Sequence, residues 1–551
     1  MIKKIIIKII LFVLSALIVT GCWLPNMPVY VPPFVPTPPV FDAPPENVNQ
    51  RPTVNAPAHG RFTIRYAPIN TLNPIIALNR DNINITSLMY ESLFELNENL
   101  VAVPVLCESW ETEDNLTFKF TIYPDIPMHD GSTLTADDVA YSIRQAQLRG
   151  RHRSKVHGIH TTTSDGDLTV TIVLESPNAR FTRLLDIPII KDGSIESTLP
   201  PGTGPYIFPN PDDFRLIRFV NHRDYSFMPL TTIFLREAND NELTELFDQG
   251  ALSLLWDDPA SAFDLRLNRD HEPRYYNTTS MQFLGFNANS YVLRDSDVRR
   301  AIGCGINRQV IVDTIMNVRP GQTIAAPVAI SPAFDMYDEE WERRVQDPLT
   351  EMGALLDRAG IDDYDNDGLL EMPDGVGGPG IKFTLQFLVN IENTHKVAAA
   401  EHIAASLRGH GFDINVRVLP WTDFIKALEE GRFDMYYGEV QIGADFDLSP
   451  LLLPGDNNLN YGRTGNTAYK LTILNFLAAD TQEEVSIAGK QLCDEIRTSA
   501  PFIPILYKRH AIYTPMGVVS SALPNYVGVA PSQSGIFRNF RNWAIDLEML
   551  T

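Results

Sequence analysis

The chain has 551 residues, of which 44% are hydrophobic and 21% charged. This composition is typical of a globular protein and excludes wholesale disorder. The length exceeds what one hydrophobic core serves, so we expect at least two lobes or domains. The formal net charge of −23 argues against nucleic acids and anionic membrane surfaces as partners, because both would repel such a protein.

The N-terminus has the pattern of an export signal. Lys3 and Lys4 precede an almost unbroken apolar run from Ile5 to Val19, which is shorter than the roughly 20 residues of a spanning helix. The following "VTGC" resembles the lipobox of bacterial lipoproteins. The resemblance implies that a signal peptide, residues 1–21, is removed and that Cys22 carries lipid; the alternative is an ordinary secreted protein with a chance cysteine.

Residues 22–60 are predicted to form an extended tether. Eleven prolines lie between Trp23 and Gly60, a density that excludes regular helix or sheet. At about 3.1 Å per residue such a segment reaches roughly 100 Å. The remaining cysteines, Cys107, Cys304 and Cys493, lie far apart without CxxC spacing, so neither a disulfide scaffold nor a zinc site is predicted. Small buried thiols are favoured over a single pair.

Beyond Gly60 the pattern alternates between strand and helix. Apolar residues at every second position predict half-buried strands around residues 62–66, 118–122 and 170–174. In "MHDGSTLTADDVAYSI", Asp130-Gly131 predicts a turn, and Thr135 is a good N-cap for a helix running to about Arg149. Asp137 and Asp138 fill the first turn, where the helix dipole favours carboxylates, so we interpret them as helix-start residues rather than a catalytic pair.

Helices in the second half carry their own start and stop signals. Asp347-Pro348 and Gly360 bracket one helix, and a capping box of Thr481 and Glu484 begins another. A third helix, with Val397, Ala400, Ile403 and Leu407 on its inner face, leads into the strand "INVRVLP". This order of elements predicts α/β lobes rather than a bundle or a sandwich.

Six segments, in order, resemble the family 5 extracellular solute-binding proteins, the peptide, nickel and related binding proteins of bacterial ABC importers. The first runs from Tyr90 to Ile143. The others are "GTGPY" at 202–206, "GFNANSYVLRDSDVRRAIGCGINRQVI" at 285–311, "LLDRAGIDDYDNDGLLE" at 355–371, "PWTDFIKALEEGRFDMY" at 420–436 and "APFIPILY" at 500–507. Each is weakly specific, but their order leaves little room for chance.

The resemblance implies an α/β, two-lobed type II periplasmic-binding-protein fold with an extra subdomain in lobe 1. We expect lobe 1 at 61–280, with the subdomain at about 86–180, lobe 2 at 281–505, and a return to lobe 1 at 506–551. Such proteins have no catalytic centre. They hold a solute between closing lobes and deliver it to an ABC permease and ATPase complex.

The resemblance also indicates ligand residues. In peptide-binding members an aspartate of lobe 2 holds the free amine of the ligand, and "GEVQIGADFDLSP" aligns Asp445 with it, followed by Asp447. A carboxylate is well matched to a desolvated ammonium, although Asp445 could instead cap its loop. Some oligopeptide binders have an arginine six residues earlier, where this chain has Glu439. A peptide-carboxylate anchor is therefore in doubt, and the three acids together would suit a cationic ligand.

Aromatic and amide residues at expected cleft edges are Trp256, Asn287, Trp421 and Tyr461. Trp421 precedes a predicted N-cap, Thr422, and a role in the core is favoured over ligand contact. Asn287 in "GFN" is at the expected lobe crossover and could serve either ligand or hinge.

No metal site or cofactor is predicted. Asp363, Asp365, Asp367 and Gly368 match the first half of a calcium loop, but the twelfth position is Asp374 rather than Glu, so an acidic turn is favoured. "HRSKVHGIH", with His152, His157 and His160, is interpreted as a basic, solvated loop rather than a nickel site.

The sequence therefore predicts a monomeric, non-enzymatic receptor, anchored by lipid outside the bacterial cell membrane, that captures a peptide or related small solute for an ABC importer. Alternatives are a surface lipoprotein that senses a peptide signal without transport, binding of an oligosaccharide or nickel chelate, and, least favoured, a secreted hydrolase. Fold alone does not decide among the ligand classes.

Overall fold

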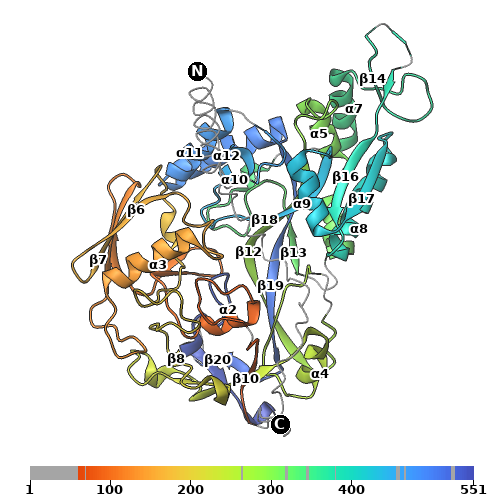
Figure 1. Ribbon diagram of the computed structural model, residues 1–551. Helices are drawn as coiled ribbons and strands as arrows, with labels where there is room; N and C mark the ends of the chain where they lie inside the picture. The colour runs from red at the N-terminus through yellow and green to blue at the C-terminus, as the bar shows by residue number, and fades with distance from the viewer. Residues whose placement is uncertain are drawn as a thin grey trace, which may run out of the picture.

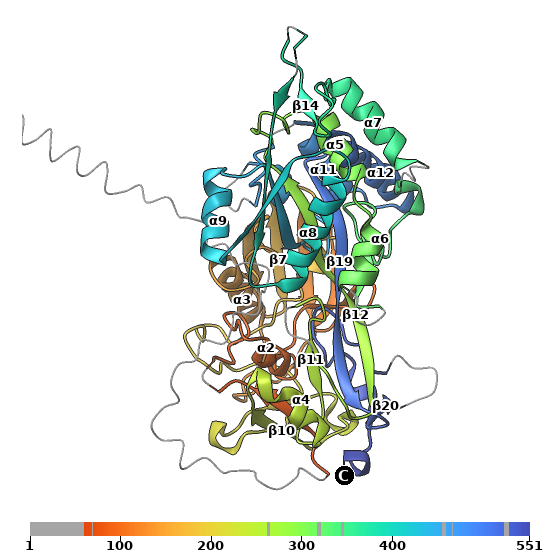
Figure 2. The same cartoon turned by 90° about the vertical axis from the view of Figure 1, so that its right-hand side faces the viewer.

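The computed structural model describes residues 60–550 apart from 69, 262–264, 317–320, 343–346, 376, 379, 455–458, 465–466 and 523–527. The predicted signal peptide, Cys22 and the tether lie outside the described residues. Two parts, here called lobe 1 and lobe 2, are joined by two long strands that run between them (Figures 1 and 2).

Lobe 1 contains two four-stranded sheets. One has the order β1 (Thr63–Tyr66), β10 (Thr232–Glu237), β9 (Arg215–Arg218) and β8 (Tyr206–Ile207). The other forms the subdomain, with the order β4 (Cys107–Glu111), β5 (Thr117–Ile122), β7 (Thr169–Leu174) and β6 (Ile159–Asp165), and it carries α3 (Ala136–Leu148). The apolar residues predicted to alternate in β1, β5 and β7 are all buried in one core, which confirms those strands.

Smaller elements complete lobe 1. Helix α2 (Arg80–Thr86) and helix α4 (Leu243–Asp248) connect strands, and two-stranded pairs join β2 (Phe94–Leu96) to β3 (Ala102–Pro104) and β20 (Val519–Ser521) to β21 (Trp543–Ile545). A short 3-10 turn, η2 (Phe181–Leu184), leaves the subdomain toward lobe 2. Cys107 and Cys493 are buried, and the three described cysteines form no disulfide with one another.

Lobe 2 is built on the larger part of a seven-stranded sheet, whose remaining part lies in lobe 1. Its order is β11 (Leu255–Asp257), β19 (Phe502–Pro515), β12 (His271–Phe286), β18 (Met435–Gln441), β16 (Leu385–Asn390) and β17 (Ile414–Leu419), and β13 (Thr323–Ala325) also pairs with β19. One face packs on α5 (Ser296–Cys304), α7 (Pro348–Ala359) and α8 (Thr394–Arg408). The other packs on α9 (Trp421–Glu430), α11 (Thr467–Ala478) and α12 (Gln482–Ser499). The short helices α6 (Arg308–Val310) and α10 (Ser449–Leu452) lie in connections, and the hairpin β14 (Glu371–Met372) and β15 (Ile381–Lys382) projects from the lobe (Figures 1 and 2).

The predicted helix boundaries agree closely with the structure. Thr135 caps α3 in a capping box in which the Asp138 carboxylate accepts from the Thr135 N–H at 2.9 Å. Asp347 and Pro348 open α7, Gly360 closes it in the left-handed conformation, and Thr481 with Glu484 opens α12. The expected N-cap at Thr422 is wrong by two residues: α9 begins at Trp421, because Pro420, which lacks an N–H, takes the cap position.

Strands β12 and β19 connect the lobes. Residues 271–277 of β12 pair with 509–515 of β19 beside β11, whereas residues 280–286 of β12 also pair with β18. The register shifts between Asn277 and Met281. The expected boundaries at 280/281 and 505/506 fall inside these two strands. No helix of the described residues is both long and apolar enough to cross a membrane.

Candidate functional site

Glu439 is at the centre of a buried charged network. It lies on β18, and its carboxylate accepts from Lys396 of α8 at 2.8 Å and from Lys508 of β19 at 2.9 Å. Lys508 also contacts Asp258, just after β11, and Gln282 donates to Glu439 at 3.1 Å. Burial alone would raise the pKa of Glu439, but the two lysines outweigh it and hold that pKa well below the usual range. Glu439 is therefore an internal counterion here rather than an unpaired ligand carboxylate.

Asp445 lies in a different environment, at the joint of the two lobes. It is 3% exposed, and its carboxylate accepts from Nδ2 of Asn178 in lobe 1 at 2.8 Å and from the N–H of Asp447 at 3.3 Å. Among the described residues, no lysine, arginine or histidine forms an ion pair with this carboxylate. Burial and the neighbouring charge of Asp447 raise the pKa of Asp445.

Asp447 faces lobe 1 through a histidine. Nε2 of His157 lies 3.6 Å from its carboxylate. Burial alone would raise the pKa of Asp447, but His157 and the Ser449 hydrogen bonds hold it down. The loop carrying His157 was expected to be solvated, and this is true of only part of it: His157 and His160 are exposed, whereas His152 is 1% exposed and Lys155 pairs with Asp186 at 2.6 Å. The loop packs at the lobe joint, where the charges of Asp186 and Asp447 attract its basic residues.

A second set of contacts pins the segment before and within η2 onto lobe 2. The Arg180 guanidinium donates to the carbonyls of Phe476 and Ala479, and lies 4.2 Å from the centroid of the Phe476 ring. Arg183 forms a two-pronged pair with Asp335 at 2.7 and 3.0 Å. Nothing in the local sequence distinguishes Arg180 and Arg183 from surface arginines, so these contacts could not be predicted from it.

Trp421, Tyr461 and Glu439 line one small pocket. Its walls are largely aromatic, including Phe424 and Tyr436, with Asn390 and Lys396 supplying polar groups, and its volume is about 30 Å³. A space of that size holds a water molecule or two. Trp421 is half-buried and stacks on Phe424 with ring centroids 5.8 Å apart, so it both packs and faces the pocket.

Trp256 lies apart from this pocket, beside Arg80. Its indole donates to the Tyr276 hydroxyl at 2.8 Å, and the Arg80 guanidinium lies 4.7 Å from its ring. Burial first, and then the nearby positive charge of Arg80, lowers the pKa of Arg151 to about 10. The Nε atoms of both arginines are buried without a hydrogen-bond partner.

Asn287 serves the backbone in this structure. Its side-chain amide donates to the carbonyls of Gly431 at 3.2 Å and Phe433 at 2.9 Å, which ties the end of β12 to the turn before β18. The other six predicted site residues form three groups: Glu439, Trp421 and Tyr461 at one pocket, Asp445 and Asp447 at the lobe joint, and Trp256 beside Arg80. Asp445 and Glu439 do not share hydrogen-bond or ion-pair partners: Asn178 and the Asp447 N–H contact the first, and Lys396 and Lys508 contact the second.

Comparison with known proteins decides the family. Residues 101–458, well over half of the chain, match the family model described as "Bacterial extracellular solute-binding proteins, family 5 Middle". The chain belongs to this family. The family 5 chain is 23% identical to heme-binding protein A of Haemophilus influenzae over 491 residues, which cover 80% of this chain and 85% of that protein.

Solved structures show the same two-lobed fold. The oligopeptide-binding protein AppA from Bacillus subtilis, in complex with a nonapeptide, superposes with a TM-score of 0.63 at 18% identity, covering 89% of this chain and 100% of AppA. NikZ from Campylobacter jejuni, in complex with Ni(L-His), gives a TM-score of 0.65 at 17% identity, covering 88% and 99%. These likenesses confirm the predicted fold class for this family 5 protein, while the ligands belong to those proteins.

Proposed function

We propose that this protein captures a peptide or related small solute with a free amine between its lobes, outside the cell, and delivers it to the permease of an ABC importer. Lipid on Cys22 would hold it at the membrane. The single observation that carries the choice of ligand is Asp445: a buried carboxylate at the lobe joint whose side-chain donor is a neutral amide.

A buried carboxylate is costly unless a cation or several donors balance it. Glu439 has two lysines for this purpose, whereas Asp445 has Asn178 and one backbone N–H. The nearby Arg180 guanidinium lowers the pKa of Asp445, but its Nε donates to the backbone carbonyl of Asp445 rather than to the carboxylate. The ammonium of a ligand entering the joint would bind the carboxylate directly through a charge-assisted hydrogen bond. Because Asp445 and Asn178 come from opposite lobes, a ligand held there would contact both lobes and favour closure.

Arg80 and Arg151 are a separate feature of lobe 1 that would suit an acidic group of a ligand. Their Nε atoms lack partners, and neither guanidinium forms an ion pair with a described carboxylate. A peptide has both an ammonium and a carboxylate, whereas a neutral oligosaccharide would use neither feature. A metal chelate with carboxylates would suit the arginines but not Asp445, and so remains the second candidate ligand class.

The test of ligand class is Asp445→Asn, measured by titration calorimetry with a panel of short peptides. A charge-assisted hydrogen bond contributes about 1.5–3 kcal/mol, so the affinity for a peptide with a free N-terminus should fall roughly 10- to 100-fold. N-acetylated peptides should bind weakly to both proteins. Asp423→Asn, which removes an exposed carboxylate of α9, is the matched control and should bind like the wild type.

Unchanged affinity in Asp445→Asn, or acetylated peptides that bind as tightly as free ones, would refute the amine site. Sensing without transport would use the same cleft, so binding does not separate it from import. Uptake of the bound peptide by cells does.

A further inference from the structure

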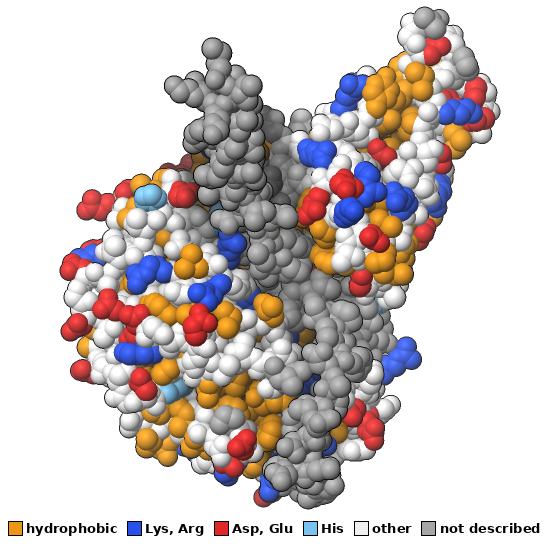
Figure 3. Space-filling model, viewed as in Figure 1, with side chains coloured by type: hydrophobic (Ala, Val, Ile, Leu, Met, Phe, Trp, Pro, Cys, Tyr) orange, Lys and Arg blue, Asp and Glu red, His pale blue; other side chains and the backbone are white. Residues whose placement is uncertain are grey.

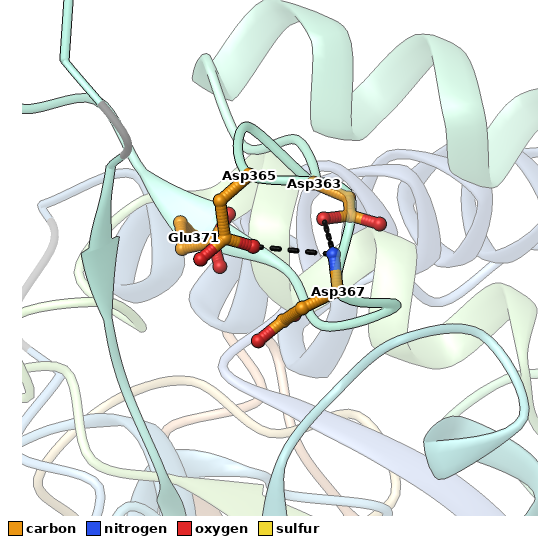
Figure 4. Close-up of side chains that lie close together, drawn as sticks. All are labelled: Asp363, Asp365, Asp367 and Glu371. Carbon is orange, nitrogen blue, oxygen red and sulfur yellow. Dashed lines mark hydrogen bonds between the residues drawn. The ribbon is translucent and has the colours of Figure 1, made fainter.

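We propose that a loop of lobe 2 binds a calcium ion through four carboxylates, Asp363, Asp365, Asp367 and Glu371, here called the carboxylate loop. One oxygen from each lies within 4.8 Å of those of the others, and Figure 4 shows the four side chains grouped around the turn between α7 and β14. The loop is remote in sequence from the proposed ligand residues, and the proposal does not depend on the proposed function.

The backbone folds tightly around this group. The N–H of Asp367 donates to the carboxylates of Asp363 at 3.0 Å and Asp365 at 3.2 Å, and Gly368 donates to Asp363 at 2.9 Å. Gly368 has a φ of +91°, a conformation that a residue with a side chain rarely adopts. The carboxylates are held together by the turn itself, but this alone indicates no ligand.

The observation that indicates a cation is the state of Glu371. Its side chain is fully buried, with 0% exposure, and Oε2 accepts from the N–H of Tyr364 at 2.8 Å. Oε1 is buried and accepts no hydrogen bond. A buried carboxylate oxygen without a hydrogen-bond donor is costly. The cation paired with this oxygen is Lys382, whose Nζ is 3.9 Å away, and the Glu371 carboxylate lies beside three others. A metal ion at the centre of the group would satisfy it.

The ammonium of Lys382 takes the place of that ion in this structure. Lys382 pairs with Glu371 in the β14–β15 hairpin, and its Nζ lies 3.0 Å from the Asp365 carboxylate, 3.9 Å from Oε1 of Glu371 and in contact with Asp367. Its side chain is 54% exposed and can swing into solvent. One ammonium against four carboxylates leaves three negative charges in excess, so a divalent cation is the better counterion.

The chemistry of the group favours calcium. All four ligands are carboxylates, which suits a hard cation, and calcium tolerates the flexible, irregular geometry of a surface turn better than magnesium does. The spacing matches a calcium loop through its sixth position, and the final acid comes at the ninth position, Glu371, rather than at the twelfth. Sites in extracellular proteins commonly bind calcium with dissociation constants of about 10⁻⁴–10⁻³ M, and competition by Lys382 places this one in that range.

Terbium luminescence in purified full-length protein, in nonionic detergent and after treatment with a chelator, tests the proposal. Terbium replaces calcium and emits when excited through a nearby tyrosine, here Tyr364, which lies within the loop. We expect emission that calcium displaces at about millimolar concentration and that an equal concentration of magnesium does not. Tyr364→Phe should lose most of the emission but keep the rise in melting temperature with calcium.

Variants of the loop decide the assignment. Asp365→Asn keeps the side-chain oxygen that accepts from Asp367 and should weaken calcium about tenfold or more, because ligand charge sets the affinity of such sites. Lys382→Met should tighten calcium by several-fold. Asp357→Asn on α7, an exposed acid whose side chain is outside the group, is the matched control and should change nothing.

A calcium response that is equal in Asp365→Asn and Asp357→Asn would overturn the proposal, and so would the absence of any response in the wild type. Either result would leave Lys382 as the only cation of the loop. Weaker binding by Lys382→Met would show that the lysine organises the carboxylates rather than competing for them, and would overturn its assigned role.

Discussion

Glu439 and Asp445 are both buried carboxylates, on and just after β18, but their neighbours give them opposite tendencies. Lys396 and Lys508 hold the pKa of Glu439 down against burial, whereas burial and Asp447 raise the pKa of Asp445. From the sequence alone the two residues look alike. The difference comes from two lysines in distant strands and helices, and it separates a structural counterion from a candidate ligand contact.

The pair of His157 and Asp447 should make stability depend on pH. Asp447 raises the pKa of His157 from 6.5 to about 9, against the effect of burial. A pKa that is higher in the folded state means that the stabilisation is complete below pH 6.5 and is lost as the pH rises through 9. The melting temperature of the wild type should therefore fall over this range more steeply than that of His157→Gln.

His160→Gln is the control, because His160 belongs to the same loop but forms no ion pair with a described carboxylate, whereas His157 pairs with Asp447. It should keep the pH dependence of the wild type. If His157→Gln keeps it as well, the ion pair at the lobe joint does not form in solution.

Helix α11 ends against the segment that leaves the subdomain. The last carbonyls of a helix lack partners within it and carry partial negative charge. Here they accept from the Arg180 guanidinium and from the N–H of Ala179, which donates to Leu477 at 2.8 Å. Positive and negative side chains are mixed on the face of the molecule that Figure 3 shows, without a large patch of one sign.

Arg180→Met should lower the free energy of unfolding by about 1–3 kcal/mol, because it leaves buried carbonyls at the end of α11 without a donor. Denaturation by urea measures the change. Arg149→Met is the matched control: it removes only an exposed pair with Glu196 and should cost less than about 1 kcal/mol. Equal losses in the two variants would show that the contact of Arg180 with α11 contributes nothing specific.

At the scale of the whole molecule, β12 and β19 are the shared elements. Each pairs in lobe 1 at one end and in lobe 2 at the other, and the register shift in β12 lies between the two regions. We propose that the lobes hinge there, because a short irregular stretch absorbs backbone rotation without breaking either sheet. Closure would then act through the joint at Asp445 and the pair of Arg183 and Asp335.

The proposed role in import also requires the N-terminal lipid. Cys22→Ser should move the protein from the membrane fraction to the soluble extracytoplasmic fraction, and uptake of a labelled peptide should fall, because the tether no longer keeps the receptor near its permease. Cys493→Ser, which changes a buried thiol of the body, is the control for a general effect of losing a cysteine. If Cys22→Ser stays in the membrane fraction as the wild type does, and takes up peptide equally well, lipid anchoring through Cys22 is refuted. Peptide binding without any uptake, even in the wild type, would favour sensing.

The sequence by itself determined the local features of this protein: the strands of β1, β5 and β7, the capped starts of α3, α7 and α12, and the ordered motifs of the family. These depend on residues within a few positions of one another. Only the tertiary structure decided which charges meet. Asn178 contacts Asp445 from 267 positions away, and Lys508 contacts Glu439 from 69 positions away. The fold also places Glu371 beside the other acids of the carboxylate loop, whereas the calcium-loop spacing indicated Asp374 as its last acid. The partners of a buried charge are set by where the chain returns in space, which no short stretch of sequence records.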